Sequence, residues 1–231
     1  MDDFEPSVSA ERVEELRRWH EDTSRSLHEL GAHDVEYLGL RLHVPEHVFP
    51  PTPVSDLLGR TIQTDVRPDD RVLDLGCGSG INALLAAQVA TDVVAVDVNP
   101  HAVAATAANA ERNGVADRVR CLESDVFDGL DADDAFDLIV IDPPFRWFAA
   151  SDLLERAITD EGYATLGRFL TEVADRLRPG GRVLLFFGTS GDVAHLDALI
   201  GISGLTNEVA AERTTLVRGE DTTYFVRRLT A

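Results

Sequence analysis

The sequence contains no lysine, so arginine supplies all 21 basic residues among its 231 positions. Aspartate and glutamate together number 41, which gives a formal net charge of −20. A field of that sign repels polyphosphates, which bind proteins through arginine and lysine contacts. The composition therefore disfavours large nucleic acids as partners and is typical of an acidic, soluble surface.

Cysteine is scarce, and long apolar segments are absent. Cys77 and Cys121 are the only cysteines, which excludes a disulfide framework or a site of four thiolates. The seven histidines do not show the spacing of a zinc motif, so we expect no metal. No apolar run reaches the ~18 residues that cross a membrane, and the acidic residues 1–5 lack the apolar segment of a secretory signal. We therefore expect a cytoplasmic protein with no membrane partner.

The first quarter of the sequence differs in pattern from the rest. Apolar spacing predicts a helix over 9–30 and a strand over 36–44. A proline-dense turn follows, in which Thr52 is the predicted cap of a helix that ends near Thr64. We expect residues 1–52 to form a short extension that serves as a lid or a dimer element, and residues 53–231 to form the main domain.

From residue 71, short apolar strands alternate with helices. The predicted strands are 71–75, 93–97, 119–122, 136–142 and 182–188, the predicted helices are 81–90, 100–113, 162–178 and 192–201, and the tail, 205–217 and 222–229, is a predicted hairpin. Continuous apolar strands separated by helices indicate a parallel sheet that is covered on both faces. We therefore predict a Rossmann-like α/β fold, with a seven-stranded doubly wound sheet and an antiparallel C-terminal hairpin. Ligands bind such sheets at the carboxyl ends of the strands.

A glycine-rich turn follows the first of these strands and contains Gly76 and Gly78. Glycines at this place let the backbone approach a ligand, and NAD and FAD use similar turns. Asp74 lies just before the glycines, where a carboxylate would repel a pyrophosphate but suit a cationic ligand such as S-adenosylmethionine. This favours S-adenosylmethionine over a nicotinamide, although an oxidoreductase remains an alternative.

Acidic residues also end the next two strands. Asp97 is placed to accept hydrogen bonds from ribose hydroxyls. Asp125 could accept from an adenine amino group, beside the backbone N–H of Val126. Each could be a surface carboxylate if it stood alone, but their order on consecutive strand ends predicts a nucleoside site.

Residues 71–188 resemble class I S-adenosylmethionine-dependent methyltransferases. The segment VLDLGCGSG (72–80) resembles their first motif, AVDVNP (95–100) is similar to their ribose-binding segment, and LRPGG (177–181) matches the turn before their fifth strand. The resemblance implies S-adenosylmethionine as methyl donor and S-adenosylhomocysteine as product.

The sequence Asp142-Pro143-Pro144-Phe145 resembles the (Asn/Asp)-Pro-Pro-(Tyr/Phe) motif of N-methyltransferases, including release-factor glutamine and adenine enzymes. The Asp142 carboxylate and the Pro143 carbonyl are two acceptors that prolines hold rigid. They could accept hydrogen bonds from both N–H groups of an NH2 group and so direct its lone pair at the methyl group. Phe145 would stack on a flat acceptor. Asp142, Pro143 and Phe145 are therefore the predicted catalytic residues.

Further contacts are expected on both sides of this motif. The predicted substrate contacts are Pro144, Trp147, Asp160, Glu161 and Tyr163. Upstream, Phe49 and Thr52 resemble a segment that covers the methionine end of the cofactor in release-factor and adenine enzymes. Release-factor enzymes carry a larger N-terminal domain than the ~50 residues before this core, which disfavours a release factor as acceptor.

These features together predict an S-adenosylmethionine-dependent N-methyltransferase. Its acceptor would be a nitrogen of a small molecule (an amine, guanidine or amide, as in natural-product biosynthesis) or of a protein side chain. A carboxylate at position 142 favours an amine or guanidine over a glutamine amide. An RNA or DNA exocyclic-amine methyltransferase and a catalytically silent cofactor-binding scaffold remain alternatives, and the extension could form a homodimer.

Overall fold

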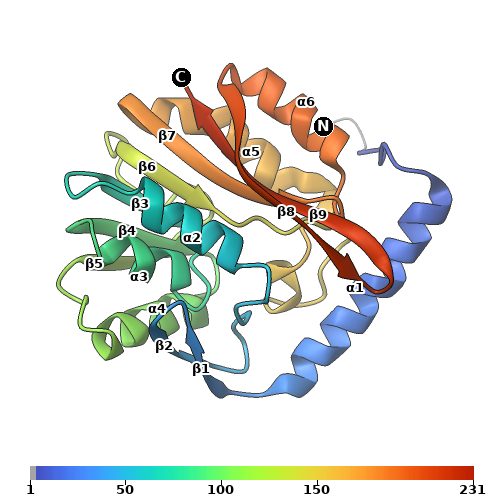
Figure 1. Cartoon of the computed structure of the whole chain (residues 1–231), viewed down its shortest axis with the longest axis horizontal. Helices are drawn as coiled ribbons and strands as arrows, with labels where there is room; N and C mark the ends of the chain where they lie inside the picture. The colour runs from blue at the N-terminus through green and yellow to red at the C-terminus, as the bar shows by residue number, and fades with distance from the viewer. Residues whose placement is uncertain (1–3) are drawn as a thin grey trace.

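The computed structural model describes residues 4–231 and is built around one sheet with strand order β5-β4-β3-β6-β7-β9-β8 (Figure 1). Its strands are β3 (Arg71–Leu75), β4 (Asp92–Asp97), β5 (Val119–Glu123), β6 (Phe136–Ile141), β7 (Leu177–Gly188), β8 (Thr206–Val217) and β9 (Glu220–Thr230). Strands β3 to β7 pair in parallel, whereas β9 pairs antiparallel with both β7 and β8. This confirms the predicted seven-stranded α/β sheet with an antiparallel C-terminal hairpin.

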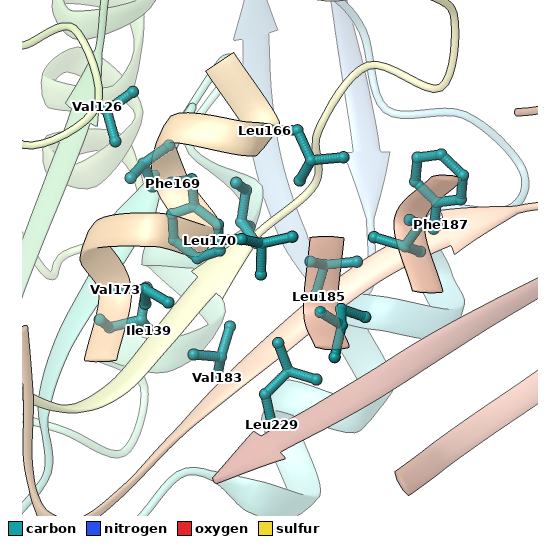
Figure 2. Close-up of a cluster of buried hydrophobic side chains, with 14 of the residues drawn as sticks. Val126, Ile139, Leu166, Phe169, Leu170, Val173, Val183, Leu185, Phe187 and Leu229 are labelled. Atoms are coloured by element: carbon teal, nitrogen blue, oxygen red, sulfur yellow. The ribbon is translucent and has the colours of Figure 1, made fainter. Parts of the chain in front are cut away.

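Helices cover both faces of the sheet, because successive strand residues point to opposite sides. Helices α2 (Asp56–Asp65) and α3 (Ile81–Ala87) pack with Val72 and Leu138 in one buried cluster, beside α4 (Pro100–Arg112). On the other face, α5 (Ala164–Glu172) and α6 (Val193–Ser203) pack with the neighbouring strand residues. Figure 2 shows Phe169 and Leu170 of α5 over Ile139 and Val183 of the sheet.

The N-terminal segment contains helix α1 (Ala10–Leu30) and a hairpin of β1 (His33–Tyr37) and β2 (Leu40–Val44). The sequence analysis predicted one strand over 36–44, but Leu38 and Gly39 have φ of 49° and 83° and turn the chain. Helix α1 runs beside the outer end of the β8–β9 hairpin, to which Arg12 and Asp22 are ion-paired (Figure 1). Leu40 and Leu42 of β2 belong to the core, and a division of the chain near residue 52 stays a prediction.

Two other elements differ from the predicted ones. Helix α2 begins at Asp56 with Ser55 as its N-terminal cap residue, so Thr52 is not the cap. The predicted helix over 162–178 is divided, because Gly162 and Tyr163 have left-handed backbone with φ of 60° and 55°. The helix therefore starts at Ala164, after short 3-10 turns at Glu155–Ala157 and Glu161–Tyr163.

The LRPGG segment is also placed differently from the prediction. Strand β7 already begins at Leu177 and includes Gly180, whose φ is 78°. The register between β6 and β7 shifts at this point, so the glycines form an irregularity inside the strand instead of a turn before it. Within residues 4–231, no helix is long and apolar enough to cross a membrane.

Candidate active site

A cavity of about 630 Å³ lies at the carboxyl ends of the parallel strands. The segments that follow β3, β4, β5 and β6 line it with residues 76–79, 97–99, 124–126 and 142–144. Residues 48–51 and parts of 150–166 complete its wall. The strand-end residues singled out from the sequence are thus largely brought to one place, as the topology predicts.

The glycine loop borders this cavity with backbone. Gly76, Gly78 and Gly80 have φ of 79°, 52° and 90°, a left-handed conformation that favours glycine. A Cβ atom at Gly76 or Gly78 would meet no atom within 4 Å, so there the loop faces open space. A Cβ at Gly80 would lie 2.9 Å from Leu84 Cδ1, so this glycine is needed for packing.

Asp97 is held at the end of β4 by the loop itself. Its Oδ2 accepts a hydrogen bond from the backbone N–H of Gly78 at 2.9 Å, and its Oδ1 accepts from that of Asn99 at 2.8 Å. Burial raises the pKa of this carboxyl, while the positive charge of Arg156 acts against the rise. The remaining lone pairs of Asp97 are available to a ligand that carries hydroxyl groups.

Asp74 does not line the cavity and lies beneath the glycine loop, with 1% of its surface exposed. Its Oδ2 accepts a hydrogen bond from the backbone N–H of Ala83 in α3, and its buried Oδ1 has no partner within residues 4–231. Burial, with the nearby Asp97 and Asp142, raises its pKa to about 7. The predicted direct contact between Asp74 and a ligand in the cavity is therefore corrected: this residue supports the loop from behind.

The turn after β5 places Asp125 and Val126 on the cavity wall. Ser124 Oγ donates to the carbonyl of Val126 and accepts from the backbone N–H of Gly129, both at 2.9 Å. These bonds hold Val126 at a φ of 50°, which is unusual for a branched residue. Asp125 is exposed, and its Oδ1 lies 3.9 Å from Arg168 Nη1.

The Asp-Pro-Pro-Phe turn after β6 divides between the cavity and the core. Asp142, Pro143 and Pro144 line the cavity, and the Asp142 carboxyl accepts no hydrogen bond from residues 4–231. Burial raises the pKa of Asp142 to about 7. Phe145 does not line the cavity, because its ring packs 5.0 Å from Phe187 and 5.6 Å from Phe186, measured between ring centroids. The structure thus places Phe145 away from the position expected for a ring that stacks on the acceptor.

Two of the aromatic side chains predicted to contact substrate are part of the core. Trp147 and Tyr163 are 7% and 2% exposed and pack with Phe4. The Tyr163 hydroxyl donates to the carbonyl of Phe145 at 2.7 Å and accepts from the backbone N–H of Asp192 at 2.9 Å. Neither residue lines the cavity, so both are corrected to positions that support the Asp-Pro-Pro-Phe turn.

The remaining predicted residues have mixed positions. Asp160 lines the cavity, but its carboxylate accepts from the backbone N–H groups of Thr165 and Leu166 and so caps α5. Glu161 is exposed on the cavity wall, and Phe49 also lines the cavity. Thr52 does not: its Oγ1 lies 3.0 Å from Ser55 Oγ, at the start of α2.

Several cavity residues are absent from the sequence-based set, and Arg156 is the one arginine among the described lining residues. It lies in the 3-10 turn Glu155–Ala157 and lines the cavity with Leu153 and Ala157. The segment between β6 and α5 has no clear hydrophobic period, so the sequence does not distinguish Arg156 from an ordinary surface arginine.

Comparison with known proteins identifies the family. The profile of the methyltransferase small domain family matches residues 52–201. Release factor glutamine methyltransferase from Bordetella pertussis is 37% identical over 169 residues, which is 66% of this chain and 61% of that protein. The chain therefore spans less than two thirds of the length of that relative. Ribosomal RNA small subunit methyltransferase C from Chromohalobacter salexigens is 39% identical over 115 residues, 50% of this chain and 30% of that one.

A solved structure with the same fold holds a nucleoside. The 16S rRNA N2 methyltransferase of T. thermophilus, in complex with S-adenosylmethionine and guanosine, has a TM-score of 0.62 and 27% identity, and the match covers 86% of this chain and 49% of that one. These rRNA methyltransferases overturn the expectation that nucleic acid is a disfavoured partner. Net charge describes the long-range field of a protein and does not define what one cavity accepts.

The residues around the cavity fit S-adenosylmethionine. The open backbone at Gly76 and Gly78 gives room for a ligand, and the Asp97 carboxylate keeps free lone pairs for hydroxyl groups. The pKa of the Asp74 carboxyl beneath the loop is about 7, so its ionised form adds negative charge that suits a cationic ligand. Together with the matches, this shows that the chain belongs to the methyltransferase small domain family of S-adenosylmethionine-dependent methyltransferases.

Proposed function

We propose that this chain is an S-adenosylmethionine-dependent N-methyltransferase whose acceptor is the side-chain amide nitrogen of a glutamine in a protein. The observation that carries the proposal is the Asp142 carboxyl, which faces the cavity without a hydrogen-bond partner within residues 4–231. The Bordetella pertussis relative, named for glutamine methylation, supports this choice of acceptor.

The cofactor would be held by the strand-end residues. Gly76, Gly78 and Asp97 would bind its sugar and methionine parts, and Asp125 and Val126 would border its adenine. When bound, S-adenosylmethionine supplies an electrophilic methyl group to a nitrogen nucleophile.

Asp142 and Pro143 would orient the acceptor. Their carboxyl and carbonyl oxygens can each accept a hydrogen bond from one N–H of a planar NH2 group. The prolines restrict the movement of both oxygens. Such alignment lowers the activation free energy of the transfer by up to roughly 7–11 kcal/mol in favourable cases. The ionised Asp142 can also accept the proton that the nitrogen must lose.

Burial changes the expectation drawn from an aspartate at this position. Because the pKa of Asp142 is about 7, its neutral form is well populated at neutral pH. A neutral carboxyl presents one carbonyl acceptor, as asparagine does. The reason to prefer a cationic acceptor over an amide is therefore weaker, although the ionised form remains available as proton acceptor.

The test is S-adenosylhomocysteine release with capped glutamine peptides as acceptors. We expect turnover by the wild type, a loss of at least about 100-fold in Asp142→Ala, and partial activity in Asp142→Asn. Asp117→Ala, an exposed change away from the cavity, is the matched control. Equal turnover by wild type and Asp142→Ala would contradict the proposed role.

A guanine amine in RNA is the second candidate acceptor, because the T. thermophilus structure holds guanosine in the same fold. A guanine exocyclic amine is also a planar NH2 group that two acceptors could orient. The same assay with a short RNA in place of the peptide separates the two candidates.

A further inference from the structure

We infer that Arg156 selects the acceptor by pairing with a carboxylate close to the methylated nitrogen, so that glutamines flanked by aspartate or glutamate are preferred. This inference rests on the proposed function, since it assumes a glutamine in a protein as acceptor. It concerns a residue that plays no part in the assigned cofactor site.

Arg156 lies in the same cavity as Asp142, the residue proposed to orient the acceptor. It lies on the wall of the cavity that also contains Asp142, between Leu153 and Ala157. Its side chain is exposed, and its positive charge acts against the rise in the pKa of Asp97 that burial causes. The guanidinium therefore acts on the cavity without being buried in the fold.

The guanidinium is unpaired within residues 4–231, where it has no ion pair or side-chain hydrogen bond. This is unusual in a chain with 41 acidic and 21 basic residues, where arginines such as Arg168, Arg182 and Arg228 each contact carboxylates. Arg18 and Arg67 are also unpaired there, but neither lines the cavity.

Helix α1 occupies the acidic sequence neighbours of Arg156. The two acidic residues nearest to Arg156 in its turn, Asp152 and Glu155, are engaged by histidines of α1. His20 Nε2 lies 2.8 Å from Glu155 Oε1, and His28 Nε2 lies 2.8 Å from Asp152 Oδ2. Helix α1 thus fixes the turn and leaves Arg156 available.

Arg156 offers one guanidinium, which matches a single carboxylate as its partner. Asp97, Asp142 and Glu161 share the cavity wall, so the site offers one guanidinium among several acidic groups. One carboxylate needs only one guanidinium, which it can bind through two parallel hydrogen bonds.

The test compares capped peptides that each contain one glutamine flanked by aspartate, by asparagine or by arginine. For the wild type we expect kcat/KM to be about fivefold higher with aspartate than with asparagine, the effect of an exposed ion pair near 1 kcal/mol. Arg156→Ala removes this preference, Arg156→Lys keeps part of it, and Arg156→Glu shifts it to the arginine peptide. Arg67→Ala, an exposed arginine away from the cavity, keeps the wild-type preference.

Other results would overturn the inference. Equal kcat/KM for all peptides in the wild type would refute the role of Arg156 while leaving glutamine methylation intact. A change in Arg156→Ala confined to the KM for S-adenosylmethionine would instead assign the residue to the cofactor. If RNA were methylated and no glutamine peptide were, the proposed function would fail and this inference with it.

Discussion

The backbone N–H of Gly78 donates a hydrogen bond to Asp97 Oδ2 over 2.9 Å and joins the loop after β3 to the end of β4. The carboxylate is therefore oriented before a ligand arrives, and a second bond from Asn99 fixes its other oxygen. A preorganised acceptor of this kind lowers the ordering cost of binding.

Replacing Asp97 with alanine tests this arrangement. We expect Asp97→Ala to weaken S-adenosylmethionine binding roughly tenfold to 100-fold, because a hydrogen bond to a charged group contributes about 1.5–3 kcal/mol. Isothermal titration calorimetry measures the Kd, with Asp117→Ala as the control. An unchanged Kd in Asp97→Ala would show that the ligand does not depend on this carboxylate.

The glycines of the loop are expected to differ in their effect on stability. Gly76→Ala places a side chain in left-handed backbone, at a cost of about 1–2 kcal/mol, but into open space. Gly80→Ala adds a contact of 2.9 Å with Leu84 Cδ1, so we expect it to lower the free energy of unfolding further. Urea denaturation compares the two variants, and equal midpoints would contradict the packing role of Gly80.

Asp142→Asn should stabilise the fold in a pH-dependent way. The folded pKa of about 7 exceeds the ordinary value of 3.8, so the folded state binds more protons than the unfolded state between these values. Stability from this group is present at low pH and is lost as pH rises through about 7. Thermal denaturation should therefore show a higher Tm for Asp142→Asn at pH 8 and little difference at pH 4. A constant Tm difference across this range would exclude the titration of Asp142 as its cause.

The same residue predicts the pH dependence of turnover. We expect wild-type kcat/KM to rise as pH passes through about 7, because the ionised Asp142 is the stronger proton acceptor. Asp142→Asn should lose this rise. A pH profile of the two proteins at saturating S-adenosylmethionine makes the comparison, and an identical rise in both would assign it to another group.

The two histidines that attach α1 to the cavity turn should differ in how much they contribute to the free energy of unfolding. His20 and Glu155 are 5% and 12% exposed in their side chains, whereas His28 and Asp152 are 44% and 45% exposed. We expect His20→Ala to lower the free energy of unfolding by about 1–3 kcal/mol. We expect His28→Ala to lower it by less than about 1 kcal/mol. Denaturant titration of both variants provides the check, and a larger loss in His28→Ala would contradict the burial argument.

The sequence predicted the parts of the fold that depend on simple periodicity. Runs such as Val72–Leu75 and Ile139–Ile141 are apolar at every position except Asp74, because both sides of a parallel strand are covered by helices. The carboxyl ends of such strands meet at one edge, so the positions of Gly76, Gly78 and Asp97 followed from the order of the motifs.

Details that depend on packing could not be predicted in this way. Phe145 and Tyr163 turn into the core because neighbouring aromatic rings and the hydroxyl–carbonyl bond between them hold them there. Asp74 lies under its loop because the backbone N–H of Ala83, in the first turn of α3, donates a hydrogen bond to its Oδ2. Arg156 has no ion pair within residues 4–231, and helix α1, more than 100 positions earlier in the chain, binds its acidic sequence neighbours.

In the proposed function, this cavity transfers a methyl group to a glutamine amide that Asp142 orients. The most direct measurement gives the wild type and Asp142→Ala methyl-labelled S-adenosylmethionine with a glutamine peptide and a short RNA in one tube. Mass spectrometry of the products then locates the label. We expect label on the glutamine amide nitrogen with the wild type and none with Asp142→Ala. Label on the RNA alone, or equal labelling by both proteins, would contradict it.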